Sequence, residues 1–123
     1  MASRAAPKDT EGHSSCAIYV RASSKKQVDE GTSIDVQLER APKYAAENRL
    51  TVYNEYVDRG ISAWKDVKRP QFEAMIEEGL AHNPPFTIIL VYDHSRFYRR
   101  VGLSEITRLK LTLNGVFVQS ITQ

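Results

Sequence analysis

Apolar and polar positions follow one another in blocks along the chain, and each block has the period of one type of element. Four short runs rich in apolar and β-branched residues predict strands near 16–21, 50–57, 86–92 and 116–121. The third run is almost entirely apolar, which is typical of a parallel strand that is buried on both faces.

Between these runs the apolar residues recur at helical spacing. This spacing predicts helices at about 34–48, 70–80 and 101–113, the last carrying Leu103, Ile106, Leu109 and Leu113. Pro70 suits a first helical position, where its missing N–H has no intrahelical partner to lose. Because strands and helices alternate, we expect an α/β fold of three layers, a mostly parallel central sheet with helices on both faces.

The composition is that of one soluble globular domain. The chain has 123 residues, of which 41% are hydrophobic and 26% charged. Its 17 Lys and Arg against 15 Asp and Glu leave a net charge of only +2. Such a charge does not indicate a nucleic-acid partner, so a basic site would have to be a local cluster.

The cysteines, the histidines and the lengths of the apolar runs indicate the cellular compartment and exclude some kinds of site. Cys16 is the only cysteine, which excludes an intramolecular disulfide and suits a reducing cytoplasm, where we expect the protein. The three histidines have no Cys or His partners at metal spacing, so we expect no metal site. No apolar run approaches the ~20 residues that cross a membrane, and we expect no membrane partner. Residues 1–15 are small and polar and are interpreted as a flexible tail before a domain at 16–123.

Candidate chemistry lies where the first strand ends. Arg21 and Ser23 are two residues apart, so on an extended chain they point to the same side. A guanidinium group can hold phosphate oxygens through two hydrogen bonds while a nearby hydroxyl attacks phosphorus. The simpler alternative is a solvated loop with a serine cap.

A second group of polar residues follows the third strand. Since parallel strands end on one edge of a sheet, we expect Ser95, Arg96, Arg99 and Arg100 to share the rim with Arg21 and Ser23, and Arg69 to reach it from the second helix. Several arginines around a serine favour phosphodiester chemistry over acyl transfer, for which His94 is the only candidate base. The first loop lacks the glycines of a flavodoxin-like nucleotide site. A solvated basic patch is the alternative.

The chain carries five stretches whose order and spacing form a pattern: Tyr19–Gln27, Ser33–Gln37, Asp58–Ser62, Lys68–Phe72 and Ser95–Arg99. Together these stretches resemble the signatures of the serine recombinases, the resolvase–invertase superfamily. The resemblance covers residues 16–123 and is closer to the large serine recombinases of phages and transposons than to the small resolvases.

This resemblance implies a reaction and its residues. It implies that Ser23 attacks a DNA phosphodiester, forms a 5′-phosphoserine link and releases a 3′-hydroxyl, with no cofactor; Ser24 is the rival nucleophile. Arg21, Arg69, Arg96 and Arg99 would bind the scissile phosphate. Gln27, Gln37 and Ser95 would support the site. Many members have Asp where this chain has Ser95, and Asp93 stands two residues earlier, so the proton-transfer group is not assigned.

The same resemblance implies the partners. They are a double-stranded DNA recombination site at the nucleoid and other copies of the full-length protein, in a dimer and a synaptic tetramer. The chain ends before the family's long dimerisation helix and DNA-binding domains, so we expect an inactive catalytic-domain fragment. Integrase, invertase and transposase roles are not distinguished. The alternative is a non-catalytic α/β module that binds phosphate or nucleic acid.

Overall fold

Seven elements alternate along the chain in the computed structural model, which describes residues 14–23, 34–60, 69–92 and 105–122. They are β1 (Ser14–Ser23), α1 (Ile34–Glu47), β2 (Leu50–Gly60), α2 (Pro70–Gly79), β3 (Ile88–Val91), α4 (Glu105–Leu113) and β4 (Phe117–Ser120). The strands form one sheet in the order β2-β1-β3-β4, and every neighbouring pair is parallel. The predicted α/β fold with a parallel sheet is confirmed.

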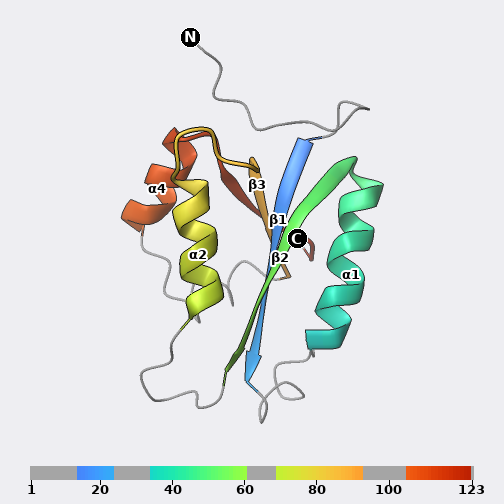
Figure 1. The fold of residues 1–123 in the computed structure, drawn as a ribbon. Helices are drawn as coiled ribbons and strands as arrows, with labels where there is room; N and C mark the ends of the chain where they lie inside the picture. Colours follow the sequence, from blue (N-terminus) through green and yellow to red (C-terminus); the bar gives the residue numbers. More distant parts are fainter. Residues whose placement is uncertain (1–13, 24–33, 61–68, 93–104, 123) are drawn as a thin grey trace.

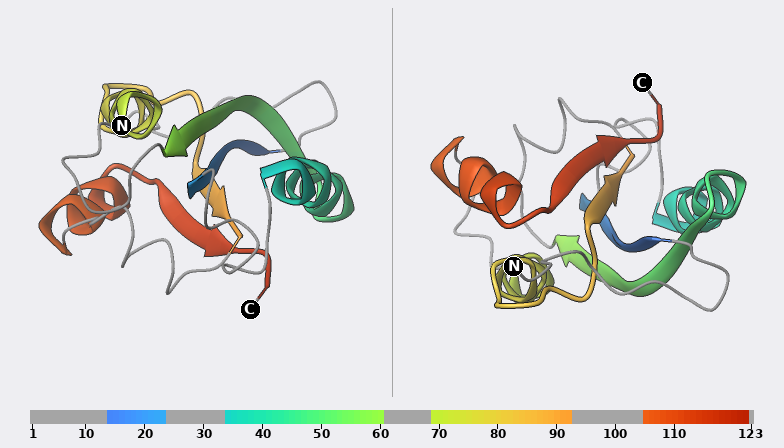
Figure 2. Two further views of the ribbon diagram at one scale, coloured as in Figure 1. Left: turned by 90° about the horizontal axis from the view of Figure 1, so that it is seen from below. Right: turned by 90° about the horizontal axis from the view of Figure 1, so that it is seen from above.

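The helices cover both faces of the sheet (Figures 1 and 2). One buried cluster lies between the sheet and α1 and includes Ile34, Ala41 and Ala45 of that helix. The other lies on the opposite face and includes Phe72 and Met75 of α2 with Leu111 of α4, and Val118 of β4 packs against it. Three layers are therefore present, as the alternation of elements predicted.

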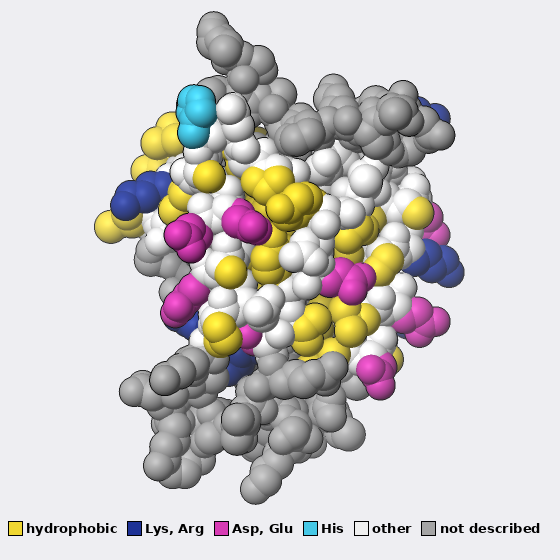
Figure 3. Space-filling view, viewed as in Figure 1, with side chains coloured by type: hydrophobic (Ala, Val, Ile, Leu, Met, Phe, Trp, Pro, Cys, Tyr) yellow, Lys and Arg dark blue, Asp and Glu magenta, His cyan; other side chains and the backbone are white. Residues whose placement is uncertain are grey.

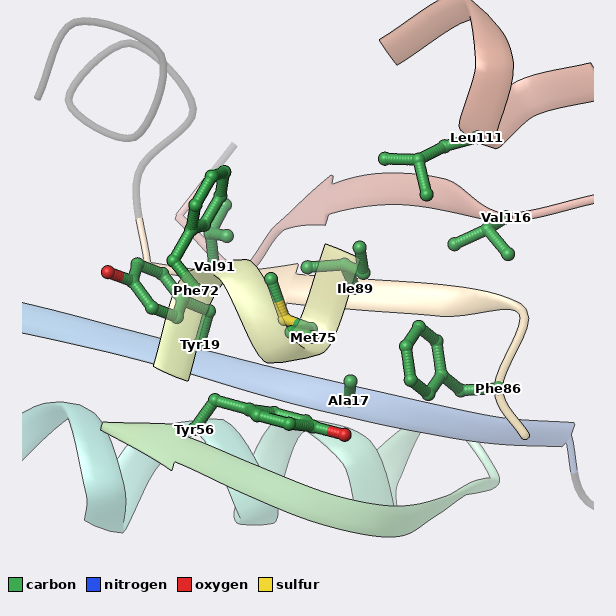
Figure 4. Packing of buried hydrophobic residues seen from close by; sticks show 10 residues of the cluster. All are labelled: Ala17, Tyr19, Tyr56, Phe72, Met75, Phe86, Ile89, Val91, Leu111 and Val116. Atoms are coloured by element: carbon green, nitrogen blue, oxygen red, sulfur yellow. The ribbon is translucent and has the colours of Figure 1, made fainter. Parts of the chain in front are cut away.

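Strand β1 supplies side chains to both clusters, which explains its unbroken apolar run. Cys16, Ile18 and Val20 face α1, while Ala17 and Tyr19 face α2, as the period of two along a strand requires. All five are at most 3% exposed. Figure 4 shows Tyr19 next to Phe72 at one end of the second cluster and Phe86 at the other; the remaining members lie between or beside them.

Helix α4 does not use the apolar positions that its sequence spacing singled out. Ile106, Leu109 and Leu113 are 67%, 54% and 78% exposed, whereas Leu111 is fully buried. The helix lies at the β4 end of the sheet, where Leu111 packs on Phe86 and on the α2 terminus near Gly79. A helix over a sheet edge contacts it along a narrow stripe, so periodicity alone indicated the wrong face of this helix.

Two strands run further than predicted. Strand β1 continues to Ser23 and β2 to Gly60, and their register pairs Tyr19 with Tyr56, Arg21 with Asp58 and Ser23 with Gly60. Pairing of β1 with β3 covers only Cys16 to Ile18. Ser23 therefore lies five residues, or about 16 Å of extended chain, beyond that pairing. Polar residues that were expected in loops therefore lie in the paired ends of β1 and β2, because pairing of the two strands provides hydrogen-bond partners for their backbone amides.

Candidate active site at the carboxyl end of the sheet

The order of the strands places β1 beside β3 in the middle of the sheet. The chain that leaves β1 continues to α1 on one face of the sheet, and the chain that leaves β3 continues to α4 on the other. Since β1 and β3 are neighbours, their carboxyl ends form a topological switch point, where open α/β sheets bind ligands. Figure 1 shows α1 and α2 both beginning on the side to which the arrowhead of β1 points.

A buried carboxylate organises this end of the sheet. Asp58, near the end of β2, is 6% exposed. Its Oδ1 accepts a hydrogen bond from the amide of Gln71 at 3.0 Å, and its Oδ2 accepts from the amide of Phe72 and from the Tyr19 hydroxyl, both at 2.9 Å. The two amides belong to the first turn of α2, where an anion is also favoured by the helix dipole.

This contact replaces a conventional helix cap. Arg69 is the N-cap residue of α2, and its side chain makes no capping hydrogen bond. Its guanidinium carbon instead lies 5.1 Å from the centre of the Phe72 ring, within the range of a cation–π contact. Phe72 in turn packs edge-on against Tyr19 with ring centres 5.4 Å apart (Figure 4). Arg69 is thus held at the start of α2 on the side of β1.

Arg21 belongs to the same charged neighbourhood. The pKa of Tyr19 is raised above its ordinary value by burial and by the adjacent Asp58 carboxylate, while the positive charges of Arg21 and Arg69 act in the opposite direction. Arg21 is half-buried, and its Nε is buried without a hydrogen-bond partner among the residues that the structure describes. A buried guanidinium N–H of this kind favours an acceptor, such as an anionic oxygen, at this position.

The structure describes some of the predicted site residues and not others. Arg21 and Arg69 lie close to Tyr19 and Asp58, as described above. Ser23 is the last residue of β1, next to Gly60 of β2 in register. Gln37 is buried on α1, on the face of the sheet opposite α2. Four predicted site residues lie outside the described ranges and stay predictions: Gln27, Ser95, Arg96 and Arg99.

The sequence analysis missed Asp58 and Tyr19 as parts of the site. Asp58 follows the predicted strand near 50–57, but in the structure it lies within β2, because β1 extends far enough to pair with it. A signal was present: the second helix opens with Lys68-Arg69-Pro70, which contains none of the usual capping residues. The orphan amides of its first turn therefore needed an acceptor from elsewhere in the chain.

The described residues contain neither a candidate metal-binding group nor a candidate membrane-spanning helix. No three His, Cys, Asp or Glu side chains in these segments are grouped so that they could hold a metal ion. None of the helices in the same segments combines the length and hydropathy needed to cross a membrane.

Comparison with known proteins places this chain in a family. Residues 16–123 match the family model described as "Resolvase, N terminal domain". The match covers most of the chain, and the chain therefore belongs to this family of resolvase-type serine recombinase catalytic domains.

Solved structures agree with this assignment. A resolvase family site-specific recombinase from Streptococcus pneumoniae superimposes with a TM-score of 0.70 at 28% identity, over 88% of this chain and 72% of the other. The N-terminal catalytic domain of TP901-1 integrase gives a TM-score of 0.68 at 33% identity, over 88% of this chain and 78% of the other.

A protein of Bacillus phage phi105, "Uncharacterized immunity region protein 3", is 42% identical to this chain over 66 residues. The aligned part covers 51% of this chain and 79% of the phage protein.

Proposed function

We propose that this chain is the DNA-cutting and DNA-joining domain of a site-specific recombinase, with Ser23 as its nucleophile. The observation that carries the proposal is the position of Ser23 at the carboxyl end of β1, two residues after Arg21. Arg21 shares a charged neighbourhood with Arg69, and membership in the resolvase family supports the same assignment.

The proposed reaction is a transesterification at phosphorus. The Ser23 oxygen bonds to the phosphorus of a DNA phosphodiester as its proton leaves, and the bond from phosphorus to the 3′ oxygen of the neighbouring nucleotide breaks. That oxygen takes up a proton, so one DNA end carries a 3′-hydroxyl and the other a 5′-phosphoserine link. Attack by the 3′-hydroxyl of an exchanged strand reverses these steps and restores Ser23. The number of phosphoester bonds is conserved, so the reaction needs no cofactor.

The arginines would stabilise the transition state. A five-coordinate phosphoryl group carries more negative charge on its equatorial oxygens than the diester, and guanidinium groups fixed in advance stabilise that charge without rearranging. Arg69 is held by Phe72 and by a helix start that Asp58 caps, which gives such preorganisation a structural basis. Arg96 and Arg99 are proposed to complete the cluster from the segment after β3.

The surface charge indicates where DNA would approach. On the face seen in Figure 3, acidic side chains are spread over α2 and α1. Glu73 and Glu77 of α2 are exposed. Phosphates would be repelled from this face, so we infer that the duplex reaches the domain at the carboxyl edge of the sheet.

A nicked suicide substrate tests the proposal. The complete protein that carries this chain would be mixed with nicked duplexes drawn from the DNA on either side of its gene, so that the released strand diffuses away. We expect a covalent protein–DNA adduct on a denaturing gel, lost in Ser23→Ala and retained in the matched control Ser24→Ala. DNA binding with no adduct would contradict the proposal and would favour a non-catalytic phosphate-binding module.

A further inference from the structure

The ring of Phe72 contacts both a tyrosine and an arginine. Its centre lies 5.4 Å from that of the Tyr19 ring, and the two ring planes meet at 65°, which is an edge-to-face arrangement. Figure 4 shows these two rings next to each other. The guanidinium carbon of Arg69 lies over the Phe72 ring, 5.1 Å from its centre. Phe72 is buried in the core and Arg69 is only half-buried, so one aromatic side chain joins the core of the domain to a charged group near its surface.

The backbone of Arg69 is restricted independently of its side chain. Pro70 follows it, which disfavours helical backbone angles at Arg69, and the carbonyl of Arg69 accepts a hydrogen bond of 3.0 Å from the amide of Glu73. Asp58 holds the amide of Phe72 in the same turn. The long side chain of the arginine is what remains variable, because it has several rotatable bonds and a large rotamer entropy. A contact beyond the backbone is therefore needed to hold the guanidinium in one place.

We propose that Phe72 is a positioning residue, whose ring face holds the Arg69 guanidinium in the place from which it binds the scissile phosphate. This inference rests on the proposed function, in which Arg69 stabilises the transition state. The face of an aromatic ring is electron-rich and attracts a cation. A displacement of about 1 Å in a catalytic group can cost up to ~10²-fold in rate, so a fixed guanidinium has catalytic value. An aliphatic side chain of similar size could fill the core but would not attract the arginine in this way.

Fluorination of the ring tests the positioning role with little change of shape. Each fluorine withdraws electrons from the ring face and weakens its attraction for a cation. In the complete protein, phenylalanines that carry one, two or three fluorines would replace Phe72. We expect single-turnover cleavage of the nicked duplex at saturating DNA to slow in steps, by about fivefold with three fluorines, with little change in the DNA concentration at half-saturation.

The matched control is the same series at Phe86, which separates positioning from core packing. The ring of Phe86 is fully buried in the same cluster, and its centre lies 5.9 and 6.5 Å from those of Tyr53 and Tyr56. Fluorination there changes aromatic packing and the melting temperature, but it should leave the cleavage rate unchanged at a temperature where the variant is folded. If three fluorines at either position slow cleavage equally, the role of Phe72 is merely structural and the inference is wrong.

The Arg69→Lys variant distinguishes a failure of this inference from a failure of the proposed function. If the native protein forms the covalent adduct and Arg69→Lys slows its formation, but the rate is constant across the fluorinated series at Phe72, this inference alone is overturned. If Arg69→Lys cleaves at the native rate, the arginine is not catalytic and the inference is again wrong. If the native protein forms no adduct, the proposed function is overturned and this inference with it.

Discussion

The hydroxyl group of Tyr19 donates a hydrogen bond of 2.9 Å to Oδ2 of Asp58 on the neighbouring strand. The same carboxylate accepts both amide bonds from the first turn of α2, so one buried charge joins β1, β2 and α2. Arg21 and Arg69 lie at the two ends of this junction, one near the end of β1 and the other at the N-cap of α2. Their relative position therefore depends on Asp58.

Replacement of Asp58 by Asn should destabilise the domain. The amide side chain has one acceptor oxygen instead of two, so at least one of the three donors loses its partner. Hydrogen bonds to charged groups contribute about 1.5–3 kcal/mol each, and we expect the free energy of unfolding to fall by about that amount. Urea unfolding measures it. Tyr19→Phe removes a single donor and should cost about 1 kcal/mol; an Asp58→Asn variant as stable as the native chain would refute the capping role.

Replacement of Arg69 by Lys should slow the chemical step. Lysine keeps the charge but lacks the planar fork that binds two oxygens at once and stacks on Phe72. We expect single-turnover cleavage to slow by at least about tenfold, or ~1.4 kcal/mol of barrier, with DNA affinity little changed.

The matched control for Arg69 is Arg108→Lys. Arg108 pairs with Glu105 on α4, and its replacement should leave cleavage unchanged. Normal cleavage in Arg69→Lys, together with weaker DNA binding and a shallower salt dependence, would indicate a solvated basic patch instead of a catalytic arginine.

The fold could be predicted from the sequence because its strongest signals are local. Strand β3 is buried on both faces and therefore reads as a continuous apolar run, and Pro70 marks the start of α2. The orientation of α4 could not be predicted in this way. The spacing of Ile106, Leu109 and Leu113 defines a helical face, but only tertiary packing determines that Leu111 meets the core.

The site was predictable only in part. Arg21 and Ser23 follow a buried apolar run in the sequence, and that position in the chain was enough to mark them as candidates. Asp58 was not recognised, because its burial depends on how far β1 extends and on three donors from distant parts of the sequence. Contacts of this kind leave no periodic pattern in the sequence.

Two of the three leucines of α4, Leu111 and Leu113, give a direct test of its packing. Leu111 is fully buried and Leu113 is 78% exposed, although they are only two residues apart. Leu111→Ala should lower the free energy of unfolding by about 2–5 kcal/mol, since it leaves a cavity in the core. Leu113→Ala should change it by less than about 0.5 kcal/mol. Urea titrations of both variants measure the difference, and equal losses would mean that the observed orientation of the helix is wrong.

The single thiol should make stability depend on pH. Burial raises the pKa of Cys16 from 9.0 to about 11. Between these values the unfolded chain has lost a proton that the folded chain retains. The contribution of the thiol to the free energy of unfolding should therefore be constant below pH about 9 and fall as the pH rises towards 11. Burial also raises the pKa of Tyr19 and of Tyr56, which steepens the fall above pH 10.

The pH dependence of the free energy of unfolding can distinguish the contribution of the Cys16 thiol from that of Tyr19 and Tyr56. Denaturant unfolding between pH 8.5 and 10 should show a shallower slope in Cys16→Ala, whatever the variant's absolute stability. An identical slope in both proteins would show that the thiol does not contribute.

The central claim is that Ser23 becomes bonded to DNA, and the direct measurement is to locate the linkage. Trypsin cuts after Arg21 and Lys25, so the adduct from a suicide substrate, digested with nuclease and trypsin, yields the peptide from Ala22 to Lys25. This peptide contains both candidate serines. Fragmentation in a mass spectrometer should place the 5′-phosphonucleotide on Ser23. A nucleotide on Ser24, or a peptide that stays unmodified while the adduct forms elsewhere, would contradict the assignment.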